Sequence, residues 1–267
     1  MTVPAAVFNV VDIYLKAIDA AAPGLVEGWY VVGSAALDDF RPGASDIDFV
    51  AVTATPPADH QLAALEGVHT HLPRRPLLDG IYITWRDLSG APEQASPGPH
   101  AHGRRFHPRC DHQRHPVTWH GLARHGIAVR GPKPADIGIG TDAQALARWT
   151  RANLDGYWRR WWQRSSRLPT PAGLACLAPQ GPAWGVLGVS RLHYTLTTGK
   201  ITSKDAAGEY AGTAFEPQWH RIIDECLRIR RGDHRRSLYR SPLTRRADAL
   251  ALVDRVIRDA PPSTGSD

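Results

Sequence analysis

Two aspartates separated by a single residue, Asp46 and Asp48, are the residues in this sequence whose type and spacing most clearly suit metal binding or catalysis. They begin a strand expected over 46–52. Residues i and i+2 of a strand face the same side, so both carboxylates project side by side while Ile47 packs into the core. Two carboxylates this close repel each other unless a cation lies between them, and oxygen ligands favour Mg²⁺. The pair therefore predicts a magnesium site.

A glycine and a serine upstream of this pair predict a phosphate-binding element. Gly33 ends a short buried strand expected over 28–33, and Ser34 begins one or two helical turns expected over 34–40. Glycine allows a ligand to approach the backbone, and the N–H groups and positive dipole end of a helix attract phosphate. Beside a metal pair, this element predicts nucleotidyl transfer from a nucleoside triphosphate, with pyrophosphate as the leaving group.

Asp79 is the candidate for a third acid, at the start of an apolar strand expected over 78–84. Two roles are open for it: completing the ligand shell of the metal, or acting as general base on an acceptor hydroxyl. Asp87, beyond that strand, is a rival candidate. The purely structural interpretations are an Asp-Gly turn for Asp79, and surface carboxylates on an edge strand for the Asp46 pair.

Alternating helical and strand patterns indicate an α/β domain with a mixed sheet over residues 1–140. Helices expected over 5–22 and 57–70 alternate with the three strands, and a helix and a short strand follow over 117–131. Residues 90–116 are rich in Pro, Gly, His and Arg with little apolar periodicity, so a long loop or irregular hairpin is expected there.

The remainder of the chain has helical patterns only, so an all-α helical bundle is expected over 141–260, followed by a disordered tail over 261–267. Helices are expected over residues 141–166, 184–198, 203–213, 215–231 and 243–259. The predicted fold class is therefore an α/β domain joined to an all-α domain.

Composition limits the class of protein. The 267 residues are 42% hydrophobic and carry a net charge of +6, which is typical of a globular protein rather than a disordered one. No apolar run reaches the length of a membrane span, the first residues do not resemble a signal peptide, and the three cysteines form no CxxC pair. A cytoplasmic protein without a membrane partner is expected. Only four of the 32 basic residues are lysines, which favours either a GC-rich genome or anionic partners.

The pattern Gly-Ser, spacer, Asp-Ile-Asp resembles the signature of the polymerase-β-type nucleotidyltransferase superfamily. Residues 187–210 resemble the helical domain of streptomycin and spectinomycin adenylyltransferases, in which an Arg-bearing helix leads through Thr-Gly-Lys-Ile to a Lys-Asp pair. The resemblance spans most of the chain but is poor over 90–116. It implies an Mg²⁺-dependent transfer of AMP from ATP, bound in the cleft between the domains, to a hydroxyl of a small molecule. An aminoglycoside is the leading acceptor, with antibiotic resistance as the consequence.

The resemblance also implies residue roles. Asp46 and Asp48 would hold Mg²⁺, and Asp79 would replace the family's glutamate general base. The residues expected to contact the nucleotide are Gly33, Ser34, Ser45, Lys204 and, as companions on the phosphates, Arg191 and Arg230.

Three departures from the family pattern place antibiotic recognition in doubt. Arg230 stands where the family has a tyrosine, and Asp79 is one methylene shorter than glutamate. The segment 180–184 lacks the family's acidic antibiotic-binding residue. The same chemistry on a natural product, a protein or an RNA end, and a catalytically silent nucleotide-binding module, therefore remain alternatives. A monomer or weak dimer is expected.

Three further clusters have a structural interpretation beside a functional one. The histidine-rich segment 100–125 is interpreted as a solvated loop that folds over the acceptor, in preference to a zinc site. Three tryptophans, Trp158, Trp161 and Trp162, are interpreted as helix packing, in preference to a stacking platform. The arginine run 228–246 is interpreted as a solvated face, and a nucleic-acid partner is not expected.

Overall fold

The computed structural model of the protein describes residues 4–73 and 75–261. The chain forms two compact units, Met1–Asp142 and Ala143–Asp267, each with its own core. The sequence placed the boundary at residue 140, close to this division. The tail expected over 261–267 lies, beyond Pro261, outside the described residues. In the part of the chain described, no helix combines the length and apolarity that crossing a bilayer requires.

The first unit is built on a mixed sheet of six strands among the described residues, in the order β5-β4-β3-β2-β1-β6. Only β2 and β3 are parallel; every other neighbouring pair is antiparallel. The strands are β1 (Gly28–Val31), β2 (Ile47–Thr53), β3 (Leu78–Thr84), β4 (Gly98–His102), β5 (Arg105–Cys110) and β6 (Ile127–Arg130). The mixed sheet and the helical second unit confirm the predicted fold class.

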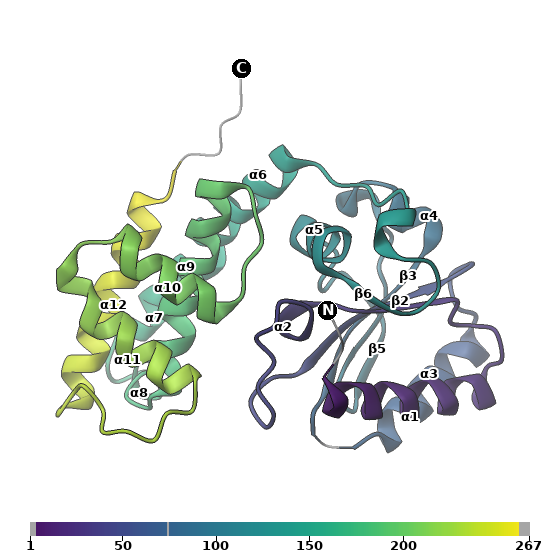
Figure 1. The fold of residues 1–267 in the computed structure, drawn as a ribbon, viewed down its shortest axis with the longest axis horizontal. Helices are drawn as coiled ribbons and strands as arrows, with labels where there is room; N and C mark the ends of the chain where they lie inside the picture. Colours follow the sequence, from purple (N-terminus) through teal and green to yellow (C-terminus); the bar gives the residue numbers. More distant parts are fainter. Residues whose placement is uncertain (1–3, 74, 262–267) are drawn as a thin grey trace. The chain divides into compact units, whose positions relative to one another are not determined.

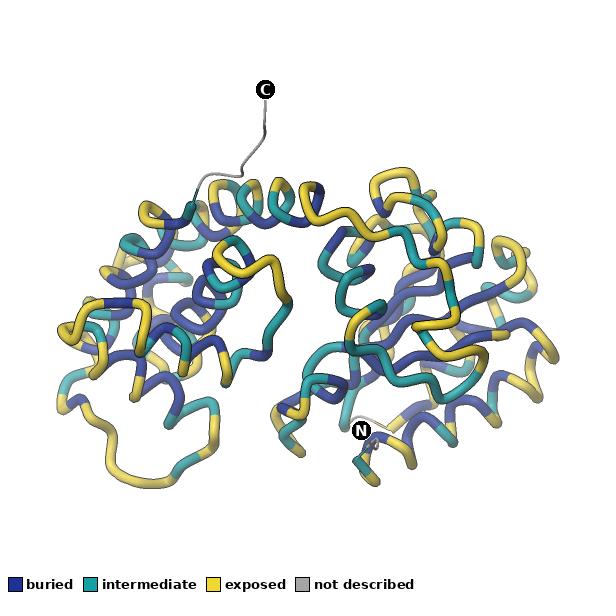
Figure 2. The backbone as a smooth tube through the Cα atoms, turned by 45° about the horizontal axis from the view of Figure 1, so that its top comes forward, coloured by how far each residue is buried: buried dark blue, intermediate teal, exposed yellow. Residues whose placement is uncertain are grey.

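Helices cover both faces of this sheet (Figure 1). The helices α1 (Ala5–Ala21) and α3 (Asp59–His71) lie on one face, and α4 (Trp85–Ser89) and α5 (Pro116–His125) on the other. The remaining helix, α2 (Gly33–Ala36), is a single turn between β1 and β2. Figure 2 shows the central strands buried along most of their length, as expected for strands covered on both sides.

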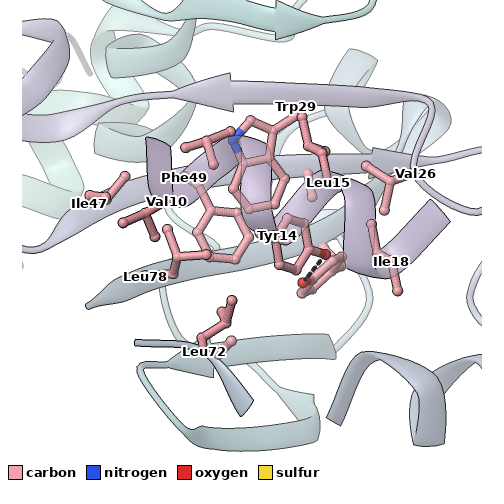
Figure 3. Packing of buried hydrophobic residues seen from close by; sticks show 14 of the residues in the cluster. Val10, Tyr14, Leu15, Ile18, Val26, Trp29, Ile47, Phe49, Leu72 and Leu78 are labelled. Atoms are coloured by element: carbon pink, nitrogen blue, oxygen red, sulfur yellow. Dashed lines mark hydrogen bonds between the residues drawn. The ribbon is translucent and has the colours of Figure 1, made fainter. Parts of the chain in front are cut away.

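The core beneath α1 is aromatic. Trp29 of β1 and Phe49 of β2 stack with ring centroids 4.1 Å apart, and Tyr14 of α1 packs against both (Figure 3). The hydroxyl of Tyr14 lies 2.5 Å from that of Tyr82, which also bonds His69 Nε2 at 2.6 Å. Burial lowers the pKa of His69 to about 4, so this histidine is neutral within the folded core.

Residues 90–116 contain a hairpin, one of the two structures expected for this segment. Strands β4 and β5 pair with an irregularity between Gly98 and His100, and β4 continues the sheet from β3. The expected interpretation of 100–125 as a solvated loop is therefore wrong, because His100 is buried in β4 and the segment continues through β5 into α5. The β5 strand is exposed or half-exposed along its length, which explains the missing apolar periodicity.

The second unit is entirely helical in the described residues up to Pro261. Its longest helix, α9 (Gln180–Thr198), packs against α10 (Lys204–Ala214), α11 (His220–Arg230) and α12 (Pro242–Asp259). The first helical stretch comprises α6 (Ala143–Asn153), a π-helical turn (Leu154–Trp158) and α7 (Arg159–Ser166), and the short α8 (Pro171–Ala175) precedes α9. The α9 helix begins four residues before the expected start, since Pro182 is tolerated in a first turn.

The tryptophans of the first helical stretch belong to the core of this unit. Trp158 fills the space above Gly188 of α9, where an added Cβ would lie 2.2 Å from the indole ring. Trp162 donates its indole N–H to the backbone oxygen of Leu250 at 3.0 Å, and Trp161 packs against the same cluster. Helix packing, the first interpretation of these residues, accounts for them.

Candidate active site

The carboxylate of Asp48 lies directly against the backbone of Gly33. A Cβ atom at position 33 would stand 1.9 Å from Asp48 Oδ2, so only glycine leaves room for the carboxylate. Gly33 also has a φ of +60°, a conformation that side chains other than glycine adopt with strain. The Val32 N–H donates to the Asp48 backbone oxygen at 2.9 Å and fixes the end of β1 beside the start of β2. The glycine bend and the second aspartate are therefore in contact.

Asp46 precedes β2 by one residue. Asp46 and Asp48 are half-buried, whereas Ile47 and Phe49 are fully buried in the core below α1. This alternation places both carboxylates on the opposite side of the chain from that core. Ser45 is buried, and its hydroxyl accepts the Arg41 N–H at 3.0 Å, which closes the turn before the aspartates.

Ser34 is half-buried in α2, next to Gly33. Because α2 has only four residues, the helix dipole that the sequence assigned to this position is small. The groups left for an anion are the backbone N–H groups at the bend and the serine hydroxyl.

Asp79 is the register neighbour of Asp48 across the parallel strands β2 and β3, and of His102 across β3 and β4. The row continues to β5, where Arg105 lies opposite His102. Side chains in register on neighbouring strands share a face and have Cα atoms about 5 Å apart. The sheet therefore lines up Asp48, Asp79, His102 and Arg105 on one face.

Both oxygens of Asp79 accept hydrogen bonds. Oδ1 lies 3.1 Å from His100 Nε2 and accepts from Gln113 Nε2 at 2.9 Å, while Oδ2 lies 3.1 Å from His102 Nδ1. Burial acts to raise the pKa of Asp79, but the hydrogen bonds and charges of His100 and His102 outweigh it and hold the pKa below its ordinary value. Asp79 is consequently an ionised carboxylate with a partner on each of its two oxygens.

Sequence reasoning missed His100, His102 and Gln113 as partners of Asp79. The two histidines have the same i, i+2 spacing as the aspartates, so alternation would have placed them on one face had 98–102 been identified as a strand. Gln113 gave no comparable signal. It reaches Asp79 from the turn between β5 and α5, where its backbone has a φ of +60°, and such strain is found at functional sites.

Asp87, the rival third acid, lies in the first turn of α4, beyond the opposite end of β3 from Asp79. The Thr84 hydroxyl caps this helix by accepting the Asp87 N–H at 3.1 Å, and it donates to Asp87 Oδ2 at 2.8 Å. Asp87 therefore does not join the Asp48 row.

The residues expected to bind phosphate from the second unit lie on three packed helices. Arg191 is in the middle of α9, Lys204 is the first residue of α10, and Arg230 is the last residue of α11. Lys204 Nζ lies 4.3 Å from the ring centroid of Trp184. The Ser203 hydroxyl caps α10 by accepting the Ala206 N–H at 3.2 Å.

Much of the arginine run 228–246 is used inside the second unit. Glu225, which is fully buried, accepts both guanidinium N–H bonds of Arg228 and lies 3.6 Å from Arg245. Arg231 pairs with Asp205 and Glu209, and Arg246 donates to the Ser165 backbone oxygen. These contacts give these members of the run structural roles within the second unit.

The described residues hold no group of three His, Cys, Asp or Glu side chains arranged to bind a metal ion by themselves. This finding covers the histidine-rich segment, where a zinc site was the alternative. Mg²⁺ is commonly held by one or two carboxylates together with water and substrate phosphates. The Asp46 pair fits that requirement, because two carboxylates lie beside a backbone bend whose N–H groups suit a phosphate, and the absence of a Cβ at Gly33 leaves room for the Asp48 carboxylate there.

Two comparisons with known proteins agree with this architecture. Residues 172–252, which span α8 to the middle of α12, match the family model "Aminoglycoside adenylyltransferase, C-terminal domain". The solved structure of spectinomycin adenyltransferase AAD(9) from Enterococcus faecialis, described as a complex with ATP and spectinomycin, is similar with a TM-score of 0.60 and 13% identity, covering 93% of this chain and 98% of that one. No curated protein sequence matches this chain significantly.

The two matches agree with the resemblance found in the sequence motifs. Because the identity is only 13%, the structural match shows similarity of fold and not of function. The family model is an independent match at the level of sequence, and it lies within the helical unit. The chain thus has a fold similar to that of spectinomycin adenyltransferase, and its residues 172–252 resemble the C-terminal domain of aminoglycoside adenylyltransferases.

Proposed function

We propose that the protein is a magnesium-dependent nucleotidyltransferase that moves AMP from ATP to a hydroxyl group of a small molecule, with an aminoglycoside-type antibiotic as the leading acceptor. The observation that carries this proposal is the contact between the Asp48 carboxylate and the Gly33 bend, with Asp79 in register beside it. The family model over 172–252 and the ATP-bound structural relative support the same chemistry.

In this proposal Asp46 and Asp48 hold Mg²⁺, which neutralises charge on the triphosphate when bound. The backbone N–H groups at Gly33 and the hydroxyl of Ser34 bind phosphate oxygens, and Ser45 holds the turn that presents the aspartates. The acceptor hydroxyl loses its proton beside Asp79, and its oxygen then bonds the α-phosphorus of ATP while the bond to the bridging oxygen breaks. Pyrophosphate leaves with that electron pair.

Lys204, Arg191 and Arg230 are proposed to stabilise the charge that develops on the pyrophosphate. Lys204 is the first residue of α10, and the helix dipole disfavours a cation there, so an anionic ligand at this position would be stabilising. The Lys204 ammonium lies above the ring of Trp184, which restricts the long side chain.

One observation favours an acceptor less cationic than an aminoglycoside. The first turns of α9, residues 180–184, carry no carboxylate where the family binds the antibiotic. A polycation binds best to a surface that presents carboxylates. A neutral or anionic hydroxyl compound is therefore the second candidate acceptor.

The test is incubation of the full chain with Mg-ATP and a panel of hydroxyl acceptors, including streptomycin and spectinomycin, with pyrophosphate release and product mass as readouts. We expect an acceptor-dependent product heavier by one adenylyl group. Asp46→Asn and Asp48→Asn should each lower kcat about 10³-fold, because each removes an oxygen charge from the ion that stabilises the transition state.

Asp38→Asn is the matched control. Asp38 is an exposed aspartate at the end of the same Gly33–Ala36 segment, with a φ of 57° that asparagine also tolerates. It should retain the wild-type rate. Pyrophosphate release that survives both Asp46→Asn and Asp48→Asn would exclude the proposed metal pair. ATP binding without any adenylylated product would instead support the silent nucleotide-binding module.

A further inference from the structure

The hydrogen bonds of Asp79 indicate which group removes the proton from the acceptor hydroxyl. This inference rests on the proposed function, since it concerns the transfer reaction. Asp79 is ionised, and an ionised carboxylate only accepts hydrogen bonds. The neighbouring nitrogens, His100 Nε2 and His102 Nδ1, must then carry the hydrogens in their contacts with it. Each neutral imidazole has one protonated nitrogen, so the lone pair of His102 is on Nε2.

The two histidines differ in access to a substrate. His100 is buried, and its Nδ1 has no hydrogen-bond partner among the described residues. The side chain of His102 is 46% exposed, compared with 18% for Asp79. Across residues 4–73 and 75–261, no group bonds His102 Nε2, whereas both oxygens of Asp79 are engaged. His102 therefore presents an accessible base that Asp79 itself does not present.

We propose that His102 Nε2 is the general base of the transfer reaction, and that Asp79 orients its ring and stabilises the imidazolium that forms. The acceptor O–H bond breaks and its proton goes to Nε2. The freed oxygen pair bonds the α-phosphorus, the bond to the bridging oxygen breaks, and pyrophosphate departs with that pair. The proton returns from His102 to solvent. His100 and Gln113 are positioning residues that act through Asp79.

This arrangement follows the logic of a carboxylate–histidine pair, in which the carboxylate fixes the tautomer and the histidine carries the proton. It assigns to His102 the role that the sequence assigned to Asp79. The lowered pKa of Asp79 makes this carboxylate a weak base. In the proposed arrangement Asp79 does not have to remove the proton from the acceptor hydroxyl itself.

The charged groups around His102 come from four elements. Asp79 faces it from β3, with Asp48 next in the row on β2. Arg105 lies opposite on β5, and His112, in the turn before α5, interacts electrostatically with His102. The pH dependence of the reaction thus belongs to this group of charges, with His102 as the member that exchanges the proton.

The test combines kinetics with the tautomer of His102. His102→Gln should lower kcat about 10²–10⁴-fold, as removal of a general base does, and should flatten the acidic limb of the kcat–pH profile. The affinity for Mg-ATP, measured by calorimetry, should stay within about twofold because the metal pair is untouched. His71→Gln is the matched control, since His71 is an exposed histidine of helix α3 whose Nδ1 lies 2.7 Å from the Gly67 backbone oxygen; it should retain kcat and the pH profile.

Nitrogen NMR of the histidine rings supplies a readout that does not depend on turnover. In the wild-type chain His102 should carry its hydrogen on Nδ1, and Asp79→Asn should shift the balance of tautomers. A wild-type His102 with its hydrogen on Nε2 would overturn the proposal. A His102→Gln variant that keeps kcat within about threefold, while Asp79→Asn loses activity, would also overturn it and would make Asp79 the base. A wild-type chain that adenylylates no acceptor, with the expected tautomer present, overturns the proposed function and the catalytic role together.

Discussion

Asp79 and Glu225 are both carboxylates withdrawn from water with a lowered pKa, but their partners differ in kind. Glu225 is fully buried and is bonded by the Arg228 guanidinium, the Ser237 hydroxyl and the Leu238 N–H. Arginine does not lose its proton in proteins, so this site cannot exchange one. Asp79 is held by His100 and His102, whose imidazole rings can both donate and accept a proton.

The comparison separates a structural carboxylate from a chemical one. A pKa shift is common to both sites, so the shift alone does not identify function. The difference lies in whether the partners can take up or release a proton and whether one of them is accessible. The exposed ring of His102 satisfies both conditions, and the partners of Glu225 satisfy neither.

The largest expected effect is on Glu225. Glu225→Gln leaves the guanidinium groups around a buried neutral side chain and should cost about 3–5 kcal/mol of unfolding free energy, measured by urea denaturation. The rate of pyrophosphate release per folded molecule should not change. Glu216→Gln, which removes an exposed glutamate paired with Arg255, is the control and should cost less than about 1 kcal/mol. A fall in kcat of the folded Glu225→Gln protein would contradict the distinction between Glu225 as a structural carboxylate and Asp79 as a catalytic-site carboxylate.

The two units should also differ in their sensitivity to acid. Burial lowers the pKa of His69 to about 4, below the value of 6.5 for the unfolded chain. The stability that depends on neutral His69 is therefore complete above pH 6.5 and is lost as the pH falls towards 4, by roughly 3 kcal/mol at most. The pKa of Glu225 is lowered from 4.5 to about 2, despite the opposing effect of its burial, by the Arg228, Ser237 and Leu238 bonds. Its contribution is complete above pH 4.5 and is lost only as the pH falls towards 2.

Between pH 6.5 and 4.5 the first unit should consequently lose protection before the second. Hydrogen exchange resolved by peptide, corrected for its intrinsic pH dependence, measures this order. His60→Gln, at an exposed position of the same helix α3, should leave the order intact. Simultaneous loss of protection in the two units over this range would count against the buried His69 as the cause.

The smallest expected effect sharpens the geometry of the site itself. Gly33→Ala pushes a methyl group into the Asp48 carboxylate and should lower kcat about 10²-fold, as displacement of a reacting group by about 1 Å does. Gly43→Ala is the matched control, because Gly43 also has a positive φ, of 81°, but open space around the added atom. It should cost about 1 kcal/mol of stability and no activity. Equal kinetic losses in the two variants would show that backbone strain, and not contact with Asp48, is the cause.

The sequence predicted the parts of the fold that have regular apolar patterns. Strand β3 has the predicted bounds, and the burial of Ile47 between two half-buried aspartates follows from alternation alone. For residues 90–116 the sequence predicted a long loop or an irregular hairpin but not the positions of β4 and β5, because the outer strand β5 is exposed or half-exposed along its length and contains Pro108. The β5 segment is a strand through its pairing with β4, which no local pattern records.

In the candidate site, too, the sequence predicted the residues that are close together in the chain but not the contacts between distant segments. The aspartates of β2 and the glycine bend are close in sequence, so spacing was sufficient to associate them. The bonds of His100 and Gln113 to Asp79 join segments 21 and 34 residues apart, and the second depends on one unusual backbone conformation. The burial of Glu225 among arginines likewise depends on long-range packing, which a run of charges does not reveal.

The row that joins Asp48, Asp79, His102 and Arg105 has a consequence for grafting or redesign of this hairpin. Sheet side chains alternate, so a shift of β4 by one residue would turn its imidazoles towards the aromatic core and present Ala101 to Asp79. An insertion inside β4 would therefore break this row, and the hairpin tip is also constrained, since the Gly103 N–H donates to the Leu78 oxygen at 2.7 Å. A scaffold that is to carry these four side chains must therefore have the same strand pairing and register, because the residue types alone would not bring them together.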